Sequence, residues 1–221
     1  MESNSPGNKE TNAWRSAFAL GLVVVLGTAL LAGVNLLTRD RILEQERRVI
    51  LEQLAQIIPP DAHDNALHED LFYFQDEAAF PQGQRVTAYR ARLQGKPVAV
   101  ILRFAAMDGY NGRINLLVGI QQDGRIAGVR VTSHKETPGL GDGIEAERGN
   151  WIHSFDQRSL ENPEVEAWAV RRDGGQFDQL TGATITPRAV VNAVRRALLY
   201  FQAHRQELFE ASSATLESAE E

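Results

Sequence analysis

One long apolar run stands out in the hydrophobic pattern of the chain, close to its N-terminus. It extends from Ser16 to Leu37, contains no charged residue, and has Asn35 as its only strongly polar side chain. At ~1.5 Å per residue, a helix of this length spans roughly 33 Å, which is enough to cross a hydrocarbon core of ~30 Å. A cleaved signal sequence has a shorter apolar core of ~7–15 residues, followed by a small-residue cleavage site. The run therefore predicts a retained transmembrane helix over residues 16–37.

The segments on either side of this run are polar or amphipathic. Residues 1–15 are mostly polar, which predicts a flexible tail. Residues 38–58 predict a helical stalk that ends at Pro59 and Pro60. One apolar stripe follows this stalk at helical spacing, formed by Leu43, Ile50, Leu54 and Ile57. Such a stripe is typical of a helix that packs on its own domain, and contact with a partner helix is the alternative.

After the stalk, the pattern changes to alternation with a period of two. It predicts two strand pairs, each joined by a turn that contains glycine. The strands are 86–93 with 97–104, joined through Gln94-Gly95-Lys96, and 114–121 with 125–132, joined through Gln122-Asp123-Gly124. Residues 165–170 form a further short candidate strand. Together these segments predict an antiparallel sheet.

A helical pattern returns at the end of the chain, from Pro187 to about Phe209. Its predicted buried face consists of Val190, Val194, Ala197, Phe201 and Leu208. Residues 210–221 are polar and acidic, which predicts a disordered tail. The expected fold class is α+β: a single N-terminal transmembrane helix, then one domain over residues 59–209 with an antiparallel sheet and flanking helices.

The composition narrows the chemistry that this chain can perform. It contains no cysteine, which excludes disulfides, thiolate metal ligands, iron–sulfur clusters and cysteine nucleophiles. Lys and Arg total 23 against 29 Asp and Glu, a net charge of -6, so no nucleic-acid partner is expected. Any redox role has to come from a bound organic cofactor.

The glycine-rich segment from Ser133 to Glu145 is one candidate site. Three glycines and a proline fall between Pro138 and Gly143, and glycines at this density let backbone N–H groups approach a ligand. No Gly-Lys-Ser/Thr ending follows, so the segment is not the phosphate loop of a nucleotide hydrolase. His134 and Glu136 alternate on one strand face, but the five histidines offer no clear third ligand, and no metal site is predicted. A plain surface loop is the alternative.

The second candidate site is the run Thr181-Gly182-Ala183-Thr184-Ile185-Thr186, which precedes Pro187. Thr186 and Pro187 are typical of a helix start, with threonine at the N-cap and proline at the first helical position. A helix N-terminus favours a phosphate, and a threonine hydroxyl there can hold one as an ester. Gly182 and Ala183 are expected to keep the approach open. A threonine nucleophile needs a base, and the sequence places none next to Thr184 or Thr186.

These residues carry a resemblance to a known family. Thr181–Thr186 resembles the Ser/Asp-Gly-Ala-Ser/Thr-x-Thr flavinylation motif of bacterial FMN-binding domains, with threonine where the first position is usually serine or aspartate. The segments His134–Gly141 and Gly109–Gly112, with the strands that follow the second, are also similar, so the resemblance spans about Val86 to Arg205 plus the anchor. The arrangement is most similar to the G subunits of Rnf-type electron transport complexes, which are related to the C subunits of sodium-translocating NADH:quinone reductases.

The resemblance implies a covalent flavoprotein. FMN would be joined through its phosphate to the hydroxyl of Thr186, by a flavin transferase that uses FAD as the donor. The implied cofactor-binding residues are Thr186, Thr184, Gly182 and Ala183 in the motif, and Glu136, Thr137, Gly139 and Leu140 in the glycine-rich segment. Lys135 or Arg188 is a further candidate, to offset the phosphate charge.

The function that the resemblance implies is electron relay. The chain would be an electron-transfer subunit of an ion-translocating oxidoreductase that moves Na⁺ or H⁺, and not a stand-alone catalyst. Its partners would be the other subunits of the complex, the flavin transferase during maturation, and the lipid of the bacterial inner membrane. The family places the domain in the periplasm, although the arginines after the apolar run favour the cytoplasm. Two alternatives stay open: a non-redox membrane-anchored binding or assembly module, and a hydrolase with a threonine nucleophile.

Overall fold

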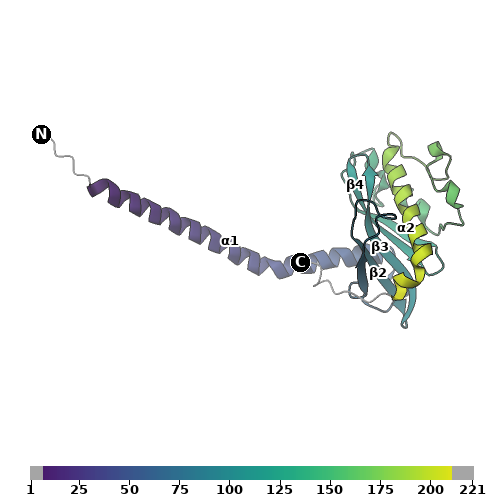
Figure 1. Ribbon diagram of the computed structural model, residues 1–221, viewed down its shortest axis with the longest axis horizontal. Helices are drawn as coiled ribbons and strands as arrows, with labels where there is room; N and C mark the ends of the chain where they lie inside the picture. The colour runs from purple at the N-terminus through teal and green to yellow at the C-terminus, as the bar shows by residue number, and fades with distance from the viewer. Residues whose placement is uncertain (1–6, 211–221) are drawn as a thin grey trace. The chain divides into compact units, whose positions relative to one another are not determined.

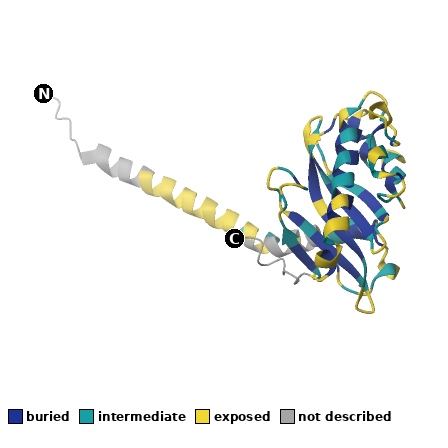
Figure 2. Ribbon diagram, turned by 45° about the vertical axis from the view of Figure 1, so that its right-hand side comes forward, coloured by how far each residue is buried: buried dark blue, intermediate teal, exposed yellow. Residues whose placement is uncertain are grey.

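The computed structural model describes residues 7–210, and its first element is the long helix α1, Gly7–Ala55 (Figure 1). Within α1, Ala17–Asn35 has a mean hydropathy of 2.4, none of it is buried, and it is long and apolar enough to cross a membrane (Figure 2). The flexible tail expected over residues 1–15 is wrong for residues 7–15, which are helical, and residues 1–6 lie outside the described residues. No proline interrupts the chain between Gly7 and the apolar run, so nothing there ends the helix.

The last turn of α1 belongs to the unit that holds the sheet. Contacts divide the described chain into two compact units that meet between Val49 and Ile50, so this unit begins earlier than the expected start at residue 59. Leu54 and Ile57 are buried in it, and Ile50 packs at the edge of the same apolar cluster. The stripe predicted on the stalk therefore packs on its own domain from Ile50 to Ile57, which follows the end of α1. The side chain of Leu43 lies outside the described residues.

A five-stranded sheet forms the centre of the domain. The strands are β1 (Leu71–Phe74), β2 (Val86–Leu93), β3 (Lys96–Gly109), β4 (Gly112–Gln121) and β5 (Ile126–Ser133). They pair antiparallel in chain order, which confirms the predicted antiparallel sheet. The hydrophobic pattern does not predict β1, because its four residues, LFYF, show no alternation with polar positions.

The turn between β2 and β3 is tighter than predicted. Leu93 pairs with Lys96, which leaves only Gln94 and Gly95 in the loop. Both residues have positive φ, 53° and 73°, as a two-residue type I′ hairpin turn requires. The turn thus follows the right-handed twist of the two strands that it joins.

The C-terminal helix α2, Ile185–Glu210, covers one face of the sheet (Figure 1). Its predicted buried face is confirmed, since Val190, Val194, Ala197, Phe201 and Leu208 are all buried in the main apolar cluster. Glu210 still belongs to the helix, and the rest of the tail predicted over 210–221 lies outside the described residues. Figure 2 shows this buried side of α2 turned to buried positions of the strands.

A second apolar cluster lies on the other face of the sheet, against the end of α1. Tyr89, Ile101 and Leu117 from the strands meet Leu54 and Ile57 there. Gly119 and Gly128 face each other in register, and a Cβ on Gly119 would lie 2.2 Å from Cγ2 of Ile57. The two glycines therefore form a notch that admits the Ile57 side chain.

The candidate strand over residues 165–170 is wrong. Val165–Ala167 forms a short 3-10 helix, η4, and only Val170 makes an isolated bridge, to Phe177. The indole N–H of Trp168 donates to the carbonyls of Ser159 and Pro163, both at 3.0 Å. Burial of Trp168 thus folds this segment back on itself instead of extending it along the sheet.

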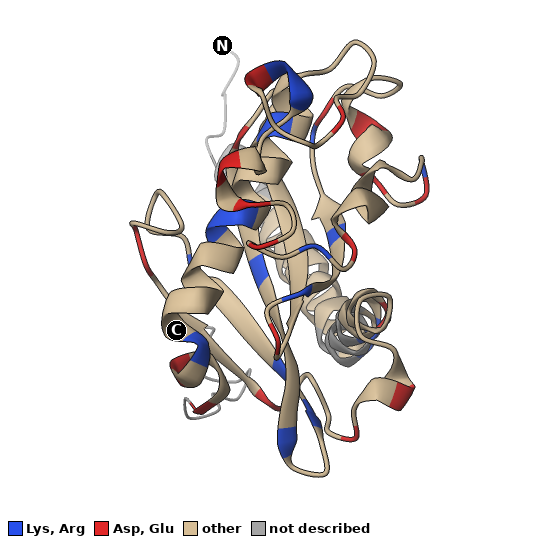
Figure 3. Ribbon diagram, turned by 90° about the vertical axis from the view of Figure 1, so that its right-hand side faces the viewer, with Lys and Arg blue, Asp and Glu red and all other residues tan. Residues whose placement is uncertain are grey.

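Charged residues of both signs are interspersed over the domain (Figure 3). The most buried ion pair joins β2 to the residue before β1: Asp70 accepts from Arg90 at 2.6 Å and from Arg92 at 2.7 Å. Arg92 also donates to the carbonyl of Phe209 at 2.8 Å. This arginine therefore ties the end of α2 to the sheet.

Candidate functional site

Three segments converge at the start of α2. They are the turn from β3 to β4, the glycine-rich segment that follows β5, and the first turn of α2 itself. The turn is preceded by a register shift between Ala106 and Gly109, and Gly112 has a φ of 104°. A bulge of this kind re-aims the chain at the end of a strand pair. It brings the backbone of Asn111 beside the glycine-rich segment.

The centre of the site is a contact between Thr186 and Glu136. The Thr186 side chain is 1% exposed and Glu136 is 5% exposed. The hydroxyl Oγ1 of Thr186 donates a short hydrogen bond to Oε2 of Glu136. The other carboxylate oxygen, Oε1, accepts from the backbone N–H of Asn111 at 3.0 Å. Both oxygens of a buried carboxylate are thus held by uncharged donors, and no ion pair to Glu136 occurs within residues 7–210.

Two glycines leave room for this contact. A Cβ on Gly141 would lie 2.9 Å from Cβ of Glu136 and 3.1 Å from Oγ1 of Thr186. A Cβ on Gly109 would lie 2.9 Å from Oε1 of Glu136 and 2.3 Å from the carbonyl oxygen of Gly112. Any side chain at either position would therefore push into the carboxylate.

His134 supports the backbone of Glu136 rather than a metal. The backbone N–H of Glu136 donates to Nδ1 of His134 at 3.0 Å, so that nitrogen is the acceptor. The proton of the neutral ring then lies on Nε2, which is 2.7 Å from Oε1 of Glu145. No group of three or more metal-ligating side chains occurs in the described part of the chain.

The start of α2 differs from the prediction. The first helical bond runs from the N–H of Arg188 to the carbonyl of Thr184, and the helix begins at Ile185 rather than Pro187. Thr184 is therefore the N-cap, and Thr186 lies inside the first turn. Within the described residues, nothing accepts from the N–H of Ile185 or Thr186. The first turn thus keeps two free donors beside the Thr186 hydroxyl.

A tight turn precedes this helix. The N–H of Ala183 donates to the carbonyl of Leu180 at 3.0 Å, and Gly182 has a φ of 79°. This is a type II turn, which requires glycine or asparagine at that position. A Cβ on Gly182 would lie 2.8 Å from Cδ2 of Leu140. Leu140 thus lies beside Gly182, which itself stays exposed, whereas Thr186 is buried, so the open approach at Gly182 does not extend to the Thr186 hydroxyl.

The glycine-rich segment does not offer its N–H groups to a ligand, as the sequence suggested it would. The carbonyl of Thr137 accepts from the N–H of Leu140 and of Gly141, at 3.2 and 3.0 Å. Asp142 accepts from the N–H of Gly139 at 2.8 Å. These bonds close the segment on itself, so its contribution to the site is close packing and the Glu136 side chain.

The predicted cationic groups are not aimed at Thr186. Arg188 donates two hydrogen bonds to Asp173, at 2.6 and 2.8 Å. These bonds from Arg188 lower the pKa of Asp173 and raise that of Arg188. Lys135 is exposed on the surface.

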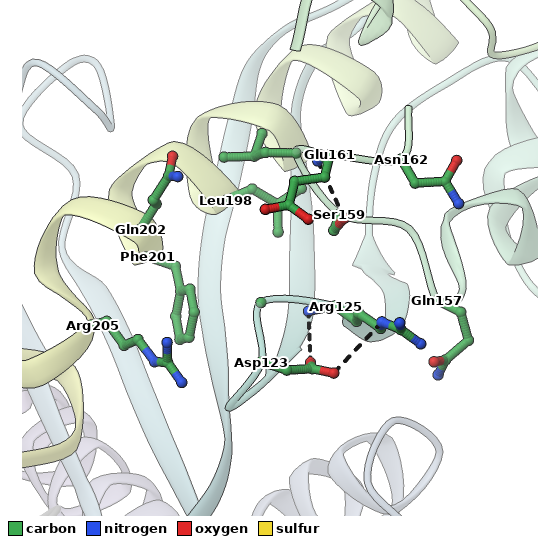
Figure 4. Close-up of a pocket in the computed structure, with 12 residues that line it drawn as sticks. Asp123, Arg125, Gln157, Ser159, Glu161, Asn162, Leu198, Phe201, Gln202 and Arg205 are labelled. Carbon is green, nitrogen blue, oxygen red and sulfur yellow. Dashed lines mark hydrogen bonds and ion pairs between the residues drawn. The ribbon is translucent and has the colours of Figure 1, made fainter. Parts of the chain in front are cut away.

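Two cavities lie near these elements. One, of about 540 Å³, is lined by Glu136, His134, Asp142 and Glu145 among others. The other, of about 750 Å³, is called here the α2 cavity and lies between α2, the β4–β5 turn and residues 157–162 (Figure 4). Figure 4 shows Arg125 paired with Asp123, and Glu161 bonded to Ser159. Thr186 lines neither of them.

Sequence reasoning did not single out Asn111 or Gly141 as contacts. Asn111 lies 25 residues from Glu136 in the chain, and Thr186 lies 50 residues from it. The only sequence signal was their place within the segments that resemble the FMN-binding family. Their meeting at one carboxylate depends on the sheet that brings those segments together.

The residues fit a phosphate held as a threonine ester. The observation that supports this fit is a hydroxyl in the first turn of a helix, beside two N–H groups that have no acceptor within the described residues. An N-terminus of this kind binds an anionic oxygen group favourably. An apolar N-terminal helix followed by an α+β domain of this kind is typical of the class of membrane-anchored FMN-binding domains.

Comparison with known proteins supports this class and gives the family. Residues 109–199 match the family model described as FMN-binding domain, and residues 1–57 match the one described as RnfG N-terminal region. The relative from Shewanella loihica is 46% identical over 194 residues, 88% of this chain and 92% of its own length. One from Pseudomonas aeruginosa is 47% identical over 201 residues, and one from Aliivibrio fischeri is 41% identical over 198, each covering 90% of this chain and 94% of the relative. All three are named as the G subunit of an ion-translocating oxidoreductase complex. The chain belongs to this family of G subunits.

Proposed function

We propose that this protein is a membrane-anchored flavoprotein subunit of an ion-translocating oxidoreductase complex, and that it relays electrons through FMN esterified to Thr186. Family membership supports the first part directly, because the relatives are subunits of such a complex and the FMN-binding model covers the site. The ester at Thr186 and the periplasmic orientation of the domain are further parts of the proposal, and each has its own test below. The other subunits of the complex are the expected electron partners.

The observation that carries the ester is the position of the Thr186 hydroxyl. It lies in the first turn of α2, beside the free N–H groups of Ile185 and Thr186. Those N–H groups would hold the phosphate oxygens, and the type II turn at Gly182 would keep the preceding chain out of the way. Thr184 fixes the turn as the N-cap through its carbonyl.

Exposed apolar side chains stand on all three segments of the site. Tyr110 is 65% exposed, Leu140 45% and Ile185 42%. An apolar surface of this kind suits the flat ring system of a flavin, which is large and mostly apolar. Bound FMN supplies one- and two-electron redox chemistry, and the protein supplies its position and surroundings.

Attachment requires the glycine-rich segment to move. The Thr186 side chain is buried, and Leu140 and Gly141 lie close to it. A flavin transferase acting on this chain, with FAD as the donor, would therefore need residues 137–143 displaced from the start of α2. The N–H groups of Gly139, Leu140 and Gly141 bond within the segment, and its side-chain contacts outside run from Thr137 to Asn111 and from Asp142 to Arg148.

Intact mass of the full-length protein, made in membranes together with a flavin transferase, tests the ester. We expect a gain of one FMN minus water, on the tryptic peptide Asp173–Arg188, and a fluorescent band after denaturing electrophoresis. Thr186→Ala should lose both signals, and Thr184→Ala should keep them. A colourless protein with active transferase present would favour the non-redox assembly module, and labelling by an acyl-transfer probe would favour the hydrolase.

The periplasmic orientation has its own test. The chain has no cysteine, so a single one can be introduced at an exposed position such as Gln176→Cys. We expect a membrane-impermeant maleimide to label it from the periplasmic side, while Ser3→Cys stays protected until the cells are lysed. The reverse pattern would place the domain in the cytoplasm, as the arginines after the span favour.

A further inference from the structure

We propose that Glu136 is the proton acceptor for the Thr186 hydroxyl when the flavin is attached. This inference rests on the proposed ester at Thr186 and assigns a catalytic role to a residue of the acceptor protein itself. The sequence places no base next to Thr186, and that absence counted against a threonine nucleophile. The fold supplies one from 50 residues away.

The geometry is that of a general base beside its nucleophile. The hydroxyl of Thr186 already donates to Oε2 of Glu136, and a base has to lie within hydrogen-bond reach of the proton that it takes. The two side chains are both buried, so water competes little for either group. Because Thr186 gives its hydrogen bond to Glu136, the lone pairs of Oγ1 are left for attack.

The carboxylate is fixed in direction as well as in distance. Asn111 holds Oε1 through its N–H, which turns Oε2 toward Thr186. The backbone N–H of Glu136 is held by His134, close to the end of β5. Gly109 and Gly141 leave the space in which this carboxylate fits. A side chain that only filled space here would not need a carboxyl group held between two hydrogen-bond donors.

The proposed step balances without a further reactant beyond the flavin dinucleotide. Oγ1 of Thr186 forms a bond to the phosphorus of the FMN half of FAD. The bond from that phosphorus to the AMP phosphate breaks, and AMP leaves with the electron pair. The hydroxyl proton passes to Oε2 of Glu136. The protonated carboxyl then can donate to an oxygen of the new phosphate, which avoids placing two negative charges side by side.

Other titratable groups surround Glu136, and their effect on the pH dependence of the rate has to be distinguished from that of Glu136. His134, Asp142, Glu145, Glu147 and Arg148 line the same 540 Å³ cavity. The end of β3 adds Asp108 and the β3–β4 turn adds Tyr110, both exposed, and α2 presents the Thr186 hydroxyl. These groups remain in a Glu136→Gln variant, as do those of the transferase. The ratio of wild-type to variant rates therefore cancels their titration.

The experiment measures the initial rate of mass gain of the full-length protein with purified transferase and FAD. Glu136→Gln keeps the shape of the side chain but removes its basicity, and we expect a rate about 10²-fold lower at neutral pH. Glu164→Gln makes the same change at an exposed residue and should leave the rate unchanged. A general base acts only in its deprotonated form, so a wild-type to Gln ratio that falls at low pH is the result expected of a base.

Each outcome decides the role of Glu136. A Gln variant within twofold of wild type overturns it, and so does a lower rate whose ratio is the same at every pH, since that is the result expected of a structural brace. If Glu136→Gln does not fold, Glu136→Asp replaces it: a slower rate that keeps the wild-type pH profile supports the base, and a flattened profile overturns it. A wild-type chain that gains no mass, or gains it without Thr186, overturns the ester and the base together.

Discussion

The acceptor site (Thr186, Glu136, Asn111 and Gly141) and the α2 cavity have opposite constructions within one domain. The α2 cavity offers about 750 Å³, but its charged groups are exposed, and Arg125 is paired with Asp123. The acceptor site is closely packed where the buried Thr186 hydroxyl meets the buried carboxylate of Glu136, although Glu136 also lines the 540 Å³ cavity. Glycines without side chains allow the close packing of the acceptor site, whereas the α2 cavity lies where turns meet a helix.

The difference follows from what each region has to stabilise. A buried carboxylate costs free energy unless its oxygens are bonded, so its surroundings have to be closely fitted. Exposed pairs such as Asp123 and Arg125 are solvated and tolerate loose surroundings. The acceptor site is therefore distinguished by its close packing and not by the volume of a cavity.

The largest effect is expected in the α2 cavity, and it should be structural only. Phe201 lines this cavity but belongs to the main apolar cluster, so Phe201→Ala should destabilise the domain by about 3–5 kcal/mol. Thermal unfolding measures this, with Phe201→Leu as the milder control. Below the unfolding transition, flavin attachment should proceed at the wild-type rate. A specific loss of attachment in a folded Phe201→Ala protein would make the cavity part of the site.

A smaller effect is expected from Gly141→Ala, on attachment. The added Cβ would meet Glu136 and Thr186 at 2.9 and 3.1 Å, so one of them has to shift. We expect about a tenfold lower rate of mass gain, since one such overpacking contact costs about 1–3 kcal/mol. Gly149→Ala, whose Cβ would meet nothing within 4 Å, is the matched control. Equal rates for the two variants would show that the close fit is not needed.

A weaker effect is expected at the edge of the acceptor site, where Arg188 holds Asp173. The folded pKa of Asp173 lies below its ordinary value of 3.8, so this pair contributes stability above that pH and loses it as the pH falls through the lowered pKa. Asp173→Asn should remove this acid-side loss in thermal unfolding curves and leave flavin attachment at neutral pH intact. A large change in attachment would assign Arg188 to the phosphate after all.

The smallest effect is expected from Arg125→Ala in the α2 cavity. The side chains of Arg125 and Asp123 are 60% and 58% exposed, and such exposed ion pairs contribute little to stability. The thermal midpoint and the rate of mass gain should both match wild type. A clear fall in either measurement would contradict the view that this cavity is a passive hollow.

Most of the fold could be predicted, because turns that contain glycine separate the apolar strands and because α2 buries one side at helical spacing. The buried face of α2 follows directly from the spacing of Val190, Val194 and Ala197. The candidate strand at residues 165–170 failed because the burial of Trp168 is a tertiary effect. The predicted start of α2 at Pro187 was wrong, because proline is tolerated throughout the first turn of a helix. The N–H groups of that turn have no partner within the helix, so the missing N–H of Pro187 costs nothing there.

The site could be predicted in its parts but not in its contacts. The motif indicated Thr186, and the glycine-rich segment indicated Glu136. Neither segment shows that one donates to the other, because their meeting depends on β3, β4 and β5. The cofactor contacts of Thr184, Gly182, Ala183, Thr137, Gly139 and Leu140 stay predictions until the flavin is mapped on the protein.

The end of α1 and the residues that follow it set where the domain can be separated from its anchor. Leu54 and Ile57 fill the second apolar cluster, and Ile57 occupies the notch at Gly119 and Gly128. A fragment cut at Pro59 would uncover Tyr89, Ile101 and Leu117 on the open face of the sheet and would be prone to aggregate. A fragment that starts before Ile50 keeps that face covered. The helix that leaves the membrane is thus, at its far end, a piece of the domain's own interior.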